Sequence, residues 1–268
     1  MVIFLWVIDR NPQMKIQEVA NDVLTVKAFD NQLRPSSKLH PDLLQPPFTL
    51  LLVAPKGSGK STTILRLIYG NKRRCKDKDK SKTHHKFYRH HFDKIYVFSP
   101  TWEMDAKMQR CLIPPDQIFD DPSVYTDVIT EILDGQQEDI AEDEAEEVLL
   151  IFSDLAGTAM FSQKKGIMNK LAFNHRHYNI SLIIDTQSLR QINNAFRENL
   201  SGIMLYAGIN NRLELKKIYE EYLGKYSEKE AQQILQYVFK DSAFNFLFIN
   251  FQKRGQMFKN FNRLQITT

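Results

Sequence analysis

A glycine-rich segment, residues 54–61, constrains this chain more than any other feature. It follows an apolar run at residues 48–53 and precedes a segment with helical periodicity at residues 62–69. A strand, a glycine-rich turn and a helix in this order form the context of a phosphate-binding loop. The glycines let the backbone turn so that successive N–H groups face one phosphate, and the N-terminal end of the helix adds positive potential. The sequence therefore predicts a P-loop, with Ala54 where the usual motif has its first glycine.

The residues of this loop have separate predicted roles. Lys60, where the helix opens, is expected to reach the β- and γ-phosphates of a nucleoside triphosphate, and the Ser61 hydroxyl is expected to ligate Mg²⁺. The predicted cofactors are therefore ATP and Mg²⁺. The segment predicted to bind the nucleotide consists of Ala54, Pro55, Lys56, Gly57, Ser58, Gly59, Lys60, Ser61 and Thr62.

The rest of the chain alternates between apolar runs and amphipathic segments. Strands are predicted at 94–99, 148–152, 180–184 and 202–206, helices at 124–133, 161–173, 213–223 and 228–239, and a closing hairpin from strands at 244–249 and 258–264. Strands that alternate with helices pair mostly in parallel. The predicted fold class is α/β: a P-loop NTPase of the RecA-like (ASCE) type, with a mostly parallel central sheet and helices on both faces.

The chain has 268 residues, enough for one large domain with a buried core. We expect a P-loop ATPase domain at 47–268 and a proline-containing extension at 1–46 that wraps around it. The apolar residues 1–8 lack the basic start of a signal peptide, so they are expected to form a strand or to follow a start codon placed too far upstream. No apolar run approaches the length of a membrane span. The two cysteines lack the spacing of metal ligands and suggest a reducing compartment.

A carboxylate follows the buried strand predicted at 148–152. The carboxyl ends of parallel strands are where such sheets bind ligands, so Asp154 is predicted to serve Mg²⁺ or the attacking water. Many P-loop ATPases have two acidic residues here, and this chain has Ser153 at the first position. Two interpretations stay open. Either Asp154 serves the metal and another group activates water, or Ser153 holds the metal weakly and Asp154 is the base.

Three polar residues further along complete the predicted site. Gln187 follows the strand at 180–184 and is predicted to act as a sensor that hydrogen-bonds the attacking water or the γ-phosphate. Arg176 and Arg197 are candidates for an arginine finger that reaches the nucleotide of a neighbouring subunit. Each arginine taken alone is more often a surface residue or a member of an ion pair.

Four segments in order resemble viral DNA-packaging ATPases of the FtsK–HerA superfamily. They are the loop at 54–61, the strand that ends at Asp154, RHYNI at 176–180 and IDTQ at 184–187, followed by FREN at 196–199. The likeness spans about residues 47–205. It is greatest to the poxvirus-type packaging ATPases of large DNA viruses, virophages and polinton-like elements.

The resemblance implies a homo-oligomeric ring that pumps double-stranded DNA into a preformed capsid. The implied partners are double-stranded DNA and capsid portal or vertex proteins, and the implied location is the host cytoplasm, in a viral factory, or the virion. The resemblance also implies that Lys60 and Ser61 bind nucleotide and metal, that Asp154 fills the Walker B role and that Gln187 is the sensor. Ser153 departs from the acidic residue usual in the family and suggests slow hydrolysis or a divergent branch.

Two charged tracts bear on the partners. Residues 72–91 contain nine Lys or Arg, two Asp and four His, and form an insert between the P-loop helix and the next strand. With the aromatic rings at 87 and 88, this insert is expected either to contact a phosphate backbone or to form a solvated loop. Its adjacent histidines do not share a helical face, which argues against zinc. Residues 138–147 hold seven carboxylates and are predicted to be a solvated linker, or a contact for a neighbour's basic loop.

The function predicted from the sequence is an ATP-driven double-stranded DNA translocase that packages a viral genome. The net charge of +4 permits nucleic-acid binding but does not demonstrate it. Three alternatives stay open. They are a P-loop kinase of a nucleotide or small molecule, a helicase or replication-initiation ATPase with an additional DNA-binding domain, and a non-hydrolysing ATP-binding structural subunit of the virion.

Overall fold

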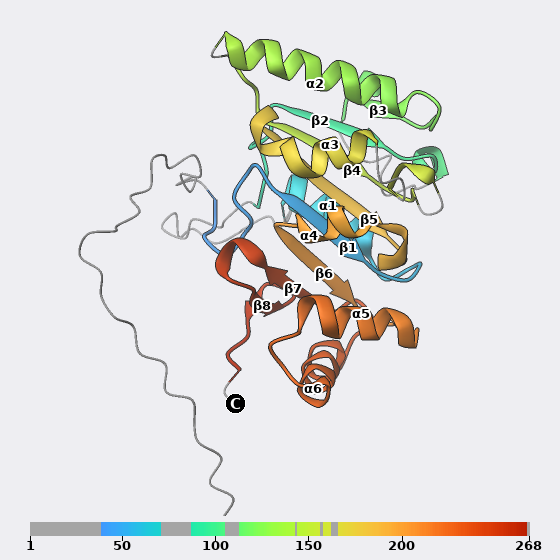
Figure 1. Ribbon diagram of the computed structural model, residues 1–268, viewed down its shortest axis with the longest axis vertical. Coiled ribbons are helices and arrows are strands. Elements are labelled where there is room, and N and C mark those ends of the chain that lie inside the picture. The colour runs from blue at the N-terminus through green and yellow to red at the C-terminus, as the bar shows by residue number, and fades with distance from the viewer. Residues whose placement is uncertain are drawn as a thin grey trace, which may run out of the picture. The chain divides into compact units, whose positions relative to one another are not determined.

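The computed structural model describes residues 39–70, 87–104, 113–142, 144–155, 158–161 and 166–266 (Figure 1). All of these residues belong to one unit of the chain, residues 35–268. Most of the expected N-terminal extension, residues 72–86 of the basic insert and both cysteines lie outside the described residues. The predicted domain boundaries therefore stay a prediction.

Within the described residues, the centre of the fold is a nine-stranded sheet with the order β3-β2-β4-β5-β1-β6-β7-β8-β9. The pairs from β3 to β6 are parallel, and those from β6 to β9 are antiparallel. The strands are β1 Thr49–Val53, β2 Lys94–Phe98, β3 Ile118–Phe119, β4 Val148–Phe152, β5 Ile180–Thr186, β6 Gly202–Tyr206, β7 Phe246–Asn250, β8 Gln256–Lys259 and β9 Asn262–Arg263. The mostly parallel α/β sheet predicted from the sequence is thus confirmed.

The helices cover the two faces of this sheet unequally (Figure 1). The core on one face includes buried residues of α2 to α6, whereas the core on the other face includes α1 and irregular segments around residues 39–44, 88, 102 and 113. The helices are α1 Lys60–Tyr69, α2 Tyr125–Ala141, α3 Ile167–Asn174, α4 Asn194–Glu198, α5 Arg212–Tyr222 and α6 Glu228–Phe239. The P-loop helix therefore has one face of the sheet largely to itself.

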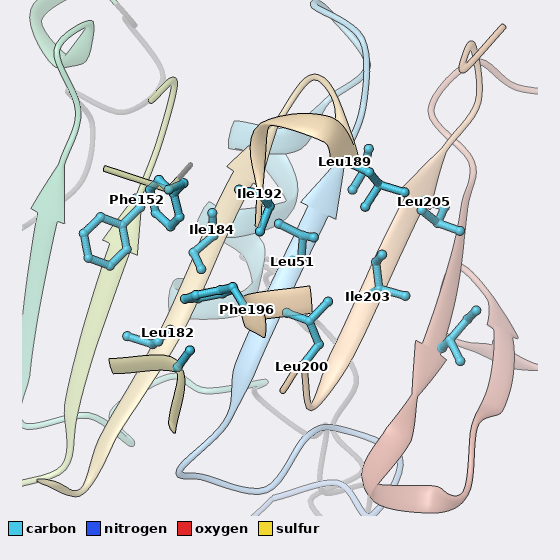
Figure 2. Close-up of a cluster of buried hydrophobic side chains, with 14 of the residues drawn as sticks. Leu51, Phe152, Leu182, Ile184, Leu189, Ile192, Phe196, Leu200, Ile203 and Leu205 are labelled. Atoms are coloured by element: carbon cyan, nitrogen blue, oxygen red, sulfur yellow. The ribbon is translucent and has the colours of Figure 1, made fainter. Parts of the chain in front are cut away.

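Alternation along the strands sorts the side chains between these two cores. On the face of α2 to α6, Leu51, Phe152 and Ile184 come from three adjacent strands and contact the same cluster. Figure 2 shows them with Phe196 of α4, whose ring lies among side chains of β1, β4 and β5. Leu50, Leu52 and Ile183 take the other face, with α1. Strands buried on both faces explain the continuous apolar runs in the sequence.

Several predicted elements change their limits. α2 runs on to Ala141 and takes in the first part of the predicted acidic linker, because Gln136 is buried and donates to the carbonyls of Glu146 and Tyr178. α3 begins at Ile167, since the preceding residues 159–161 form a 3-10 turn. The predicted last strand is two short strands, β8 and β9, separated by a turn at residues 260–261. β3 and α4 were not predicted.

The C-terminal end of the basic insert packs into the core. Tyr88 is 3% exposed, donates its hydroxyl to the Leu44 carbonyl at 2.9 Å and lies with its ring 5.0 Å from that of Phe48. Burial raises the pKa of its hydroxyl. The ring of Phe87 contacts that of Phe261 at 5.1 Å. The enclosed ring of Tyr88 therefore cannot contact a phosphate backbone, and such a contact by the basic insert stays a prediction.

The end of the acidic tract is also paired rather than purely solvated. Glu146 forms an ion pair with Lys94, and Glu147 lies 2.8 Å from Nε2 of His91. Both pairs join the start of β2 to the start of β4. None of the described helices combines the length and the apolar character that a bilayer crossing needs.

Candidate nucleotide-binding site

The P-loop connects the end of β1 to the start of α1. Ala54 N–H donates to the Thr186 carbonyl at 3.0 Å, so the loop is fixed to β5 as it leaves the sheet. Gly57 and Gly59 have φ values of 82° and 95°, in the left-handed region that residues with a Cβ rarely adopt. Gly59 accepts the N–H of Thr63 at 3.0 Å, which begins the helix. The first-turn N–H groups of α1 have no partner within the helix and are available to a phosphate.

Lys60 is buried beneath this loop. Its ammonium group donates to the Ala54 carbonyl at 3.0 Å, and the Ser58 hydroxyl donates to the Pro55 carbonyl. Ser61 lies in the first turn of the helix and is half-buried. Backbone N–H groups, an ammonium and a hydroxyl make a donor set that fits a polyphosphate.

The carboxyl ends of β1, β5 and β4 lie at one edge of the sheet, because the three strands are parallel and in register. Val53 pairs with Thr186, and Phe152 pairs with Ile184. β5 thus separates the P-loop strand from the strand that precedes Ser153 and Asp154. Residues that follow these three strands are brought together at the loop.

Asp154 holds an exposed carboxylate at this edge. Its backbone is left-handed, with φ 53°, and its Oδ2 accepts a hydrogen bond from the Thr101 hydroxyl at 3.0 Å. Aspartate tolerates this conformation better than most residues do. A carboxylate and the Ser61 hydroxyl are oxygen ligands that suit Mg²⁺. The described residues contain no cluster of three or more His, Cys, Asp or Glu that could hold a metal, so a cation here would need phosphate oxygens as well.

A second carboxylate, which the sequence-based prediction missed, lies beside it. Asp185 of β5 is 3% exposed, and its Oδ2 accepts the hydroxyl of Ser153 at 2.7 Å while its Oδ1 accepts the N–H of Asp154 at 3.2 Å. Burial raises the pKa of this carboxyl, and the Ser153 hydrogen bond and the charge of Lys60 oppose the rise. The signal in the sequence was one charge within an apolar strand, on the same face as Ile183.

Gln187 follows β5 directly and is exposed at the same edge. On one side, the Thr186 carbonyl holds the P-loop. On the other side, Ser188 donates its hydroxyl to Glu214, whose second oxygen accepts the N–H of Leu189 at 3.1 Å. Glu214 lies in the first turn of α5 and is buried. The position fits the sensor role, which stays a prediction.

Arg176 lies at the opposite edge of the sheet. It belongs to the 3-10 turn His175–Tyr178 that precedes β5, and it is exposed. β5 has 7 residues, so its length places this arginine about 20 Å from the P-loop of its own subunit. Arg176 can serve as a finger only towards a neighbouring subunit, which is the predicted role.

Arg197 is placed differently from the prediction. Its side chain is 4% exposed and forms a bidentate ion pair with Glu221, with both contacts at 2.9 Å. The remaining N–H groups donate to the carbonyls of Leu189 and Ile192 and to the side chain of Asn194. All five guanidinium N–H groups are therefore used within the subunit. This arrangement argues against Arg197 as a trans-acting finger and makes it a structural support of the segment after β5.

Comparisons with known proteins agree with this architecture. No protein-family model matches the chain, and no curated protein sequence matches it significantly. Among solved structures, it is similar to the genome packaging NTPase B204 from Sulfolobus turreted icosahedral virus 2. The structure of B204 in complex with ATPγS gives a TM-score of 0.52 and 16% identity, over 82% of this chain and 99% of B204. The structure of B204 in complex with AMPPCP gives a TM-score of 0.54 and 15% identity, over 81% of this chain and 98% of B204.

The DNA-packaging ATPase B204 from Sulfolobus turreted icosahedral virus gives a TM-score of 0.52 and 14% identity, over 83% of this chain and 99% of that chain. At these identities the similarity concerns the fold. The chain has the fold of P-loop ATPases, and the resemblance to viral genome-packaging ATPases that the sequence suggested is confirmed at the level of architecture.

Proposed function

We propose that this chain is the subunit of a homo-oligomeric ring that hydrolyses ATP and drives double-stranded DNA into a viral capsid. The observation that carries the proposal is the site itself. A P-loop with a buried lysine meets carboxylates from two further parallel strands at one edge of the sheet. The fold shared with B204, a viral genome-packaging NTPase, supports the class of motor.

In the proposed mechanism, the loop N–H groups bind the phosphates and Lys60 exchanges the Ala54 carbonyl for the β- and γ-phosphate oxygens. Ser61 and a carboxylate at the strand edge would hold Mg²⁺, which when bound neutralises charge on those oxygens. Gln187 orients the attacking water in line with the γ-phosphate, and Arg176 of a neighbouring subunit supplies positive charge. The chain contributes positioning and charge, and no covalent intermediate is formed.

The same proposal assigns double-stranded DNA, capsid vertex or portal proteins and other copies of the chain as partners. It places the protein in a viral factory of the host cytoplasm or in the virion. Contact with the DNA backbone alone would give little sequence preference and a strong dependence on salt.

One observation favours a second candidate, an ATP-binding structural subunit that does not hydrolyse ATP. Ser153 replaces a carboxylate, and its hydroxyl is engaged by Asp185. If Asp185 has no part in the reaction, the site has a single acidic group. In that case nucleotide would bind without turnover.

The test is ATP hydrolysis by the purified chain with and without double-stranded DNA, with the oligomeric state recorded. We expect DNA-stimulated turnover in an oligomer, and its loss in Lys60→Ala. The matched control is Lys229→Ala, which removes an exposed lysine of α6. Nucleotide binding without turnover in an assembled ring would overturn the motor and favour the structural subunit.

A further inference from the structure

The buried pair of Ser153 and Asp185 is the feature that the predicted mechanism leaves unexplained. Phe152 and Ile184 are paired across β4 and β5, so the next residues, Ser153 and Asp185, lie side by side on the same face of the sheet. That face is the one covered by α1. The serine hydroxyl donates to the aspartate at 2.7 Å. Many P-loop ATPases have two consecutive acidic residues after the strand that corresponds to β4. Here the first of those positions is Ser153, and the carboxylate beside it comes from the neighbouring strand β5.

We propose that Asp185 is the metal-holding carboxylate of this site, in place of the acidic residue that Ser153 replaces. On this assignment, Asp154 is free to position the attacking water, and Ser153 is a positioning residue that orients Asp185. This inference rests on the proposed nucleotide-binding function. It resolves the ambiguity of the sequence in favour of a site with two carboxylates from two strands.

The surroundings of Asp185 support the assignment. The charged groups that act on it are Lys60 of the P-loop and Asp154. Its charge also acts on Tyr206 of β6, whose hydroxyl donates to Thr63 on α1 at 2.7 Å. The carboxylate therefore faces the P-loop helix and not the opposite core. Burying a carboxylate is costly unless its partners compensate, and a bound cation beside the phosphates would do so.

The test measures metal dependence of binding, not turnover. Affinity for a fluorescent ATP analogue is determined as a function of Mg²⁺ concentration, and again in EDTA, for the wild type and Asp185→Asn. We expect Asp185→Asn to require at least about 10-fold more Mg²⁺ for the same tightening of nucleotide binding, with unchanged affinity in EDTA. An unchanged Mg²⁺ dependence would overturn the proposal and leave Asp185 as a structural residue.

The matched variant exchanges the two residues, Ser153→Asp with Asp185→Ser. It keeps one carboxylate and one hydroxyl in the pair, so it tests the proposal even if Asp185→Asn does not fold. We expect the exchange to retain a Mg²⁺ dependence close to that of the wild type. A folded exchange variant without it would contradict the assignment. Absence of turnover in the wild type, with these binding results intact, would overturn the proposed hydrolysis alone.

A second observation concerns the other side of the P-loop. Phe244, in the turn between α6 and β7, is 65% exposed, yet its Cδ1 would lie 3.4 Å from a Cβ placed on Gly59. The backbone of this turn is fixed, because Asn245 donates its side-chain amide to the Lys240 carbonyl at 2.7 Å and accepts the Ala207 N–H at 3.1 Å. An exposed aromatic ring is thus held against the phosphate-binding loop.

From this position we infer that Phe244 is the stacking platform for the base of the nucleotide. On the proposed mechanism, Asp154, which follows β4, and Asp185 of β5 lie at the γ-phosphate end of the site. The nucleoside therefore leaves the loop on the other side, towards β6 and β7, where Phe244 stands. Base stacking on an aromatic side chain is tolerant of base identity, so the ring is expected to favour nucleotides over bare polyphosphate without selecting one base.

The test compares binding of ATP with binding of inorganic tripolyphosphate. Phe244→Ala is expected to weaken ATP binding about 10-fold and to leave tripolyphosphate binding unchanged, while Phe244→Trp restores ATP binding. The control is Phe173→Ala, which removes another exposed phenylalanine, on α3. Equal effects of Phe244→Ala on both ligands, or no effect on either, would overturn the inference.

Discussion

The P-loop and the neighbouring end of β5 are built on different principles. The P-loop is one continuous segment whose glycines, lysine and serine carry its shape and its donors. The end of β5 depends on distant partners. Ser153 and Asp154, which follow β4, contact Asp185, and Glu214 of α5 accepts hydrogen bonds from Ser188 and Leu189. Substitutions within the contiguous P-loop should therefore alter activity with little effect on the free energy of unfolding. Substitutions at the end of β5, where distant segments meet, should mainly lower the free energy of unfolding.

The largest effect is expected at the support of the segment after β5. Arg197→Ala should reduce the free energy of unfolding by about 3–5 kcal/mol, because it breaks a buried ion pair and removes the hydrogen bonds to two backbone carbonyls and one side-chain oxygen. Urea unfolding measures this. Arg176→Ala, which removes an exposed arginine, is the control and should stay within about 0.5 kcal/mol of the wild type. Equal stability of the two variants would contradict the structural role of Arg197.

The loop should respond in the opposite sense. Lys60→Ala should lower ATP turnover by about 10²–10³-fold, since one preorganised charge at the transferred phosphate is lost. Its unfolding free energy should fall much less than that of Arg197→Ala, by about 1 kcal/mol, because Lys60 makes one hydrogen bond, to the Ala54 carbonyl, besides its charge interaction with Asp185. Parallel turnover and unfolding measurements decide this. A large loss of unfolding free energy would show that Lys60 also stabilises segments outside the loop.

The start of β5 adds a pH-dependent test. Burial lowers the pKa of His175 from 6.5 to about 4, and its Nδ1 lies 2.9 Å from the Ile180 carbonyl. Below pH 6.5 the unfolded chain binds a proton that the folded chain does not, so stability falls as the pH drops from 6.5 to 4. The loss should approach about 2–3 kcal/mol. Thermal unfolding against pH should show a shallower fall in His175→Asn, and an identical profile would refute this account.

The smallest effect is expected within the loop backbone. A Cβ at Gly57 would meet no atom, but φ is 82°, so Gly57→Ala pays only for the left-handed conformation. The expected cost is about 1 kcal/mol of unfolding free energy. A comparison with Gly255→Ala, another open site with a φ of 73°, controls for the conformational cost alone. A much larger loss of unfolding free energy in Gly57→Ala than in Gly255→Ala would mean that further contacts of the loop depend on the backbone conformation at Gly57.

The same contrast explains how far the sequence could be interpreted. The P-loop, β4, β6 and α6 were predicted at or near their observed limits, because each has a local signal in its apolar periodicity or its glycines. β3 has 2 residues and α4 has 5, too few for a periodic pattern to appear. The helix predicted at 124–133 was too short, because the burial of Gln136, which continues α2 to Ala141, depends on segments that meet only in the fold.

In the candidate site, the residues that could be predicted were those with a recognisable position relative to one strand. Asp154 and Gln187 follow their strands directly. Asp185 was passed over because its role depends on which strand lies beside β4, and strand order is not visible in one sequence. Arg197 was misjudged for a related reason: its five acceptors come from two segments that meet only in the fold.

The attachments on either side of Gln187 have a mechanical consequence. The backbone before it is tied to the P-loop through Thr186 and Ala54, and the backbone after it is tied to α5 through Ser188 and Glu214. Gln187, the proposed sensor of the γ-phosphate, thus lies on a segment that is hydrogen-bonded both to the P-loop and to an outer helix. Any shift of the loop when the phosphate leaves must either stretch these bonds or carry α5 with it. In a ring, α5 would then transmit the movement of the loop to other parts of the assembly.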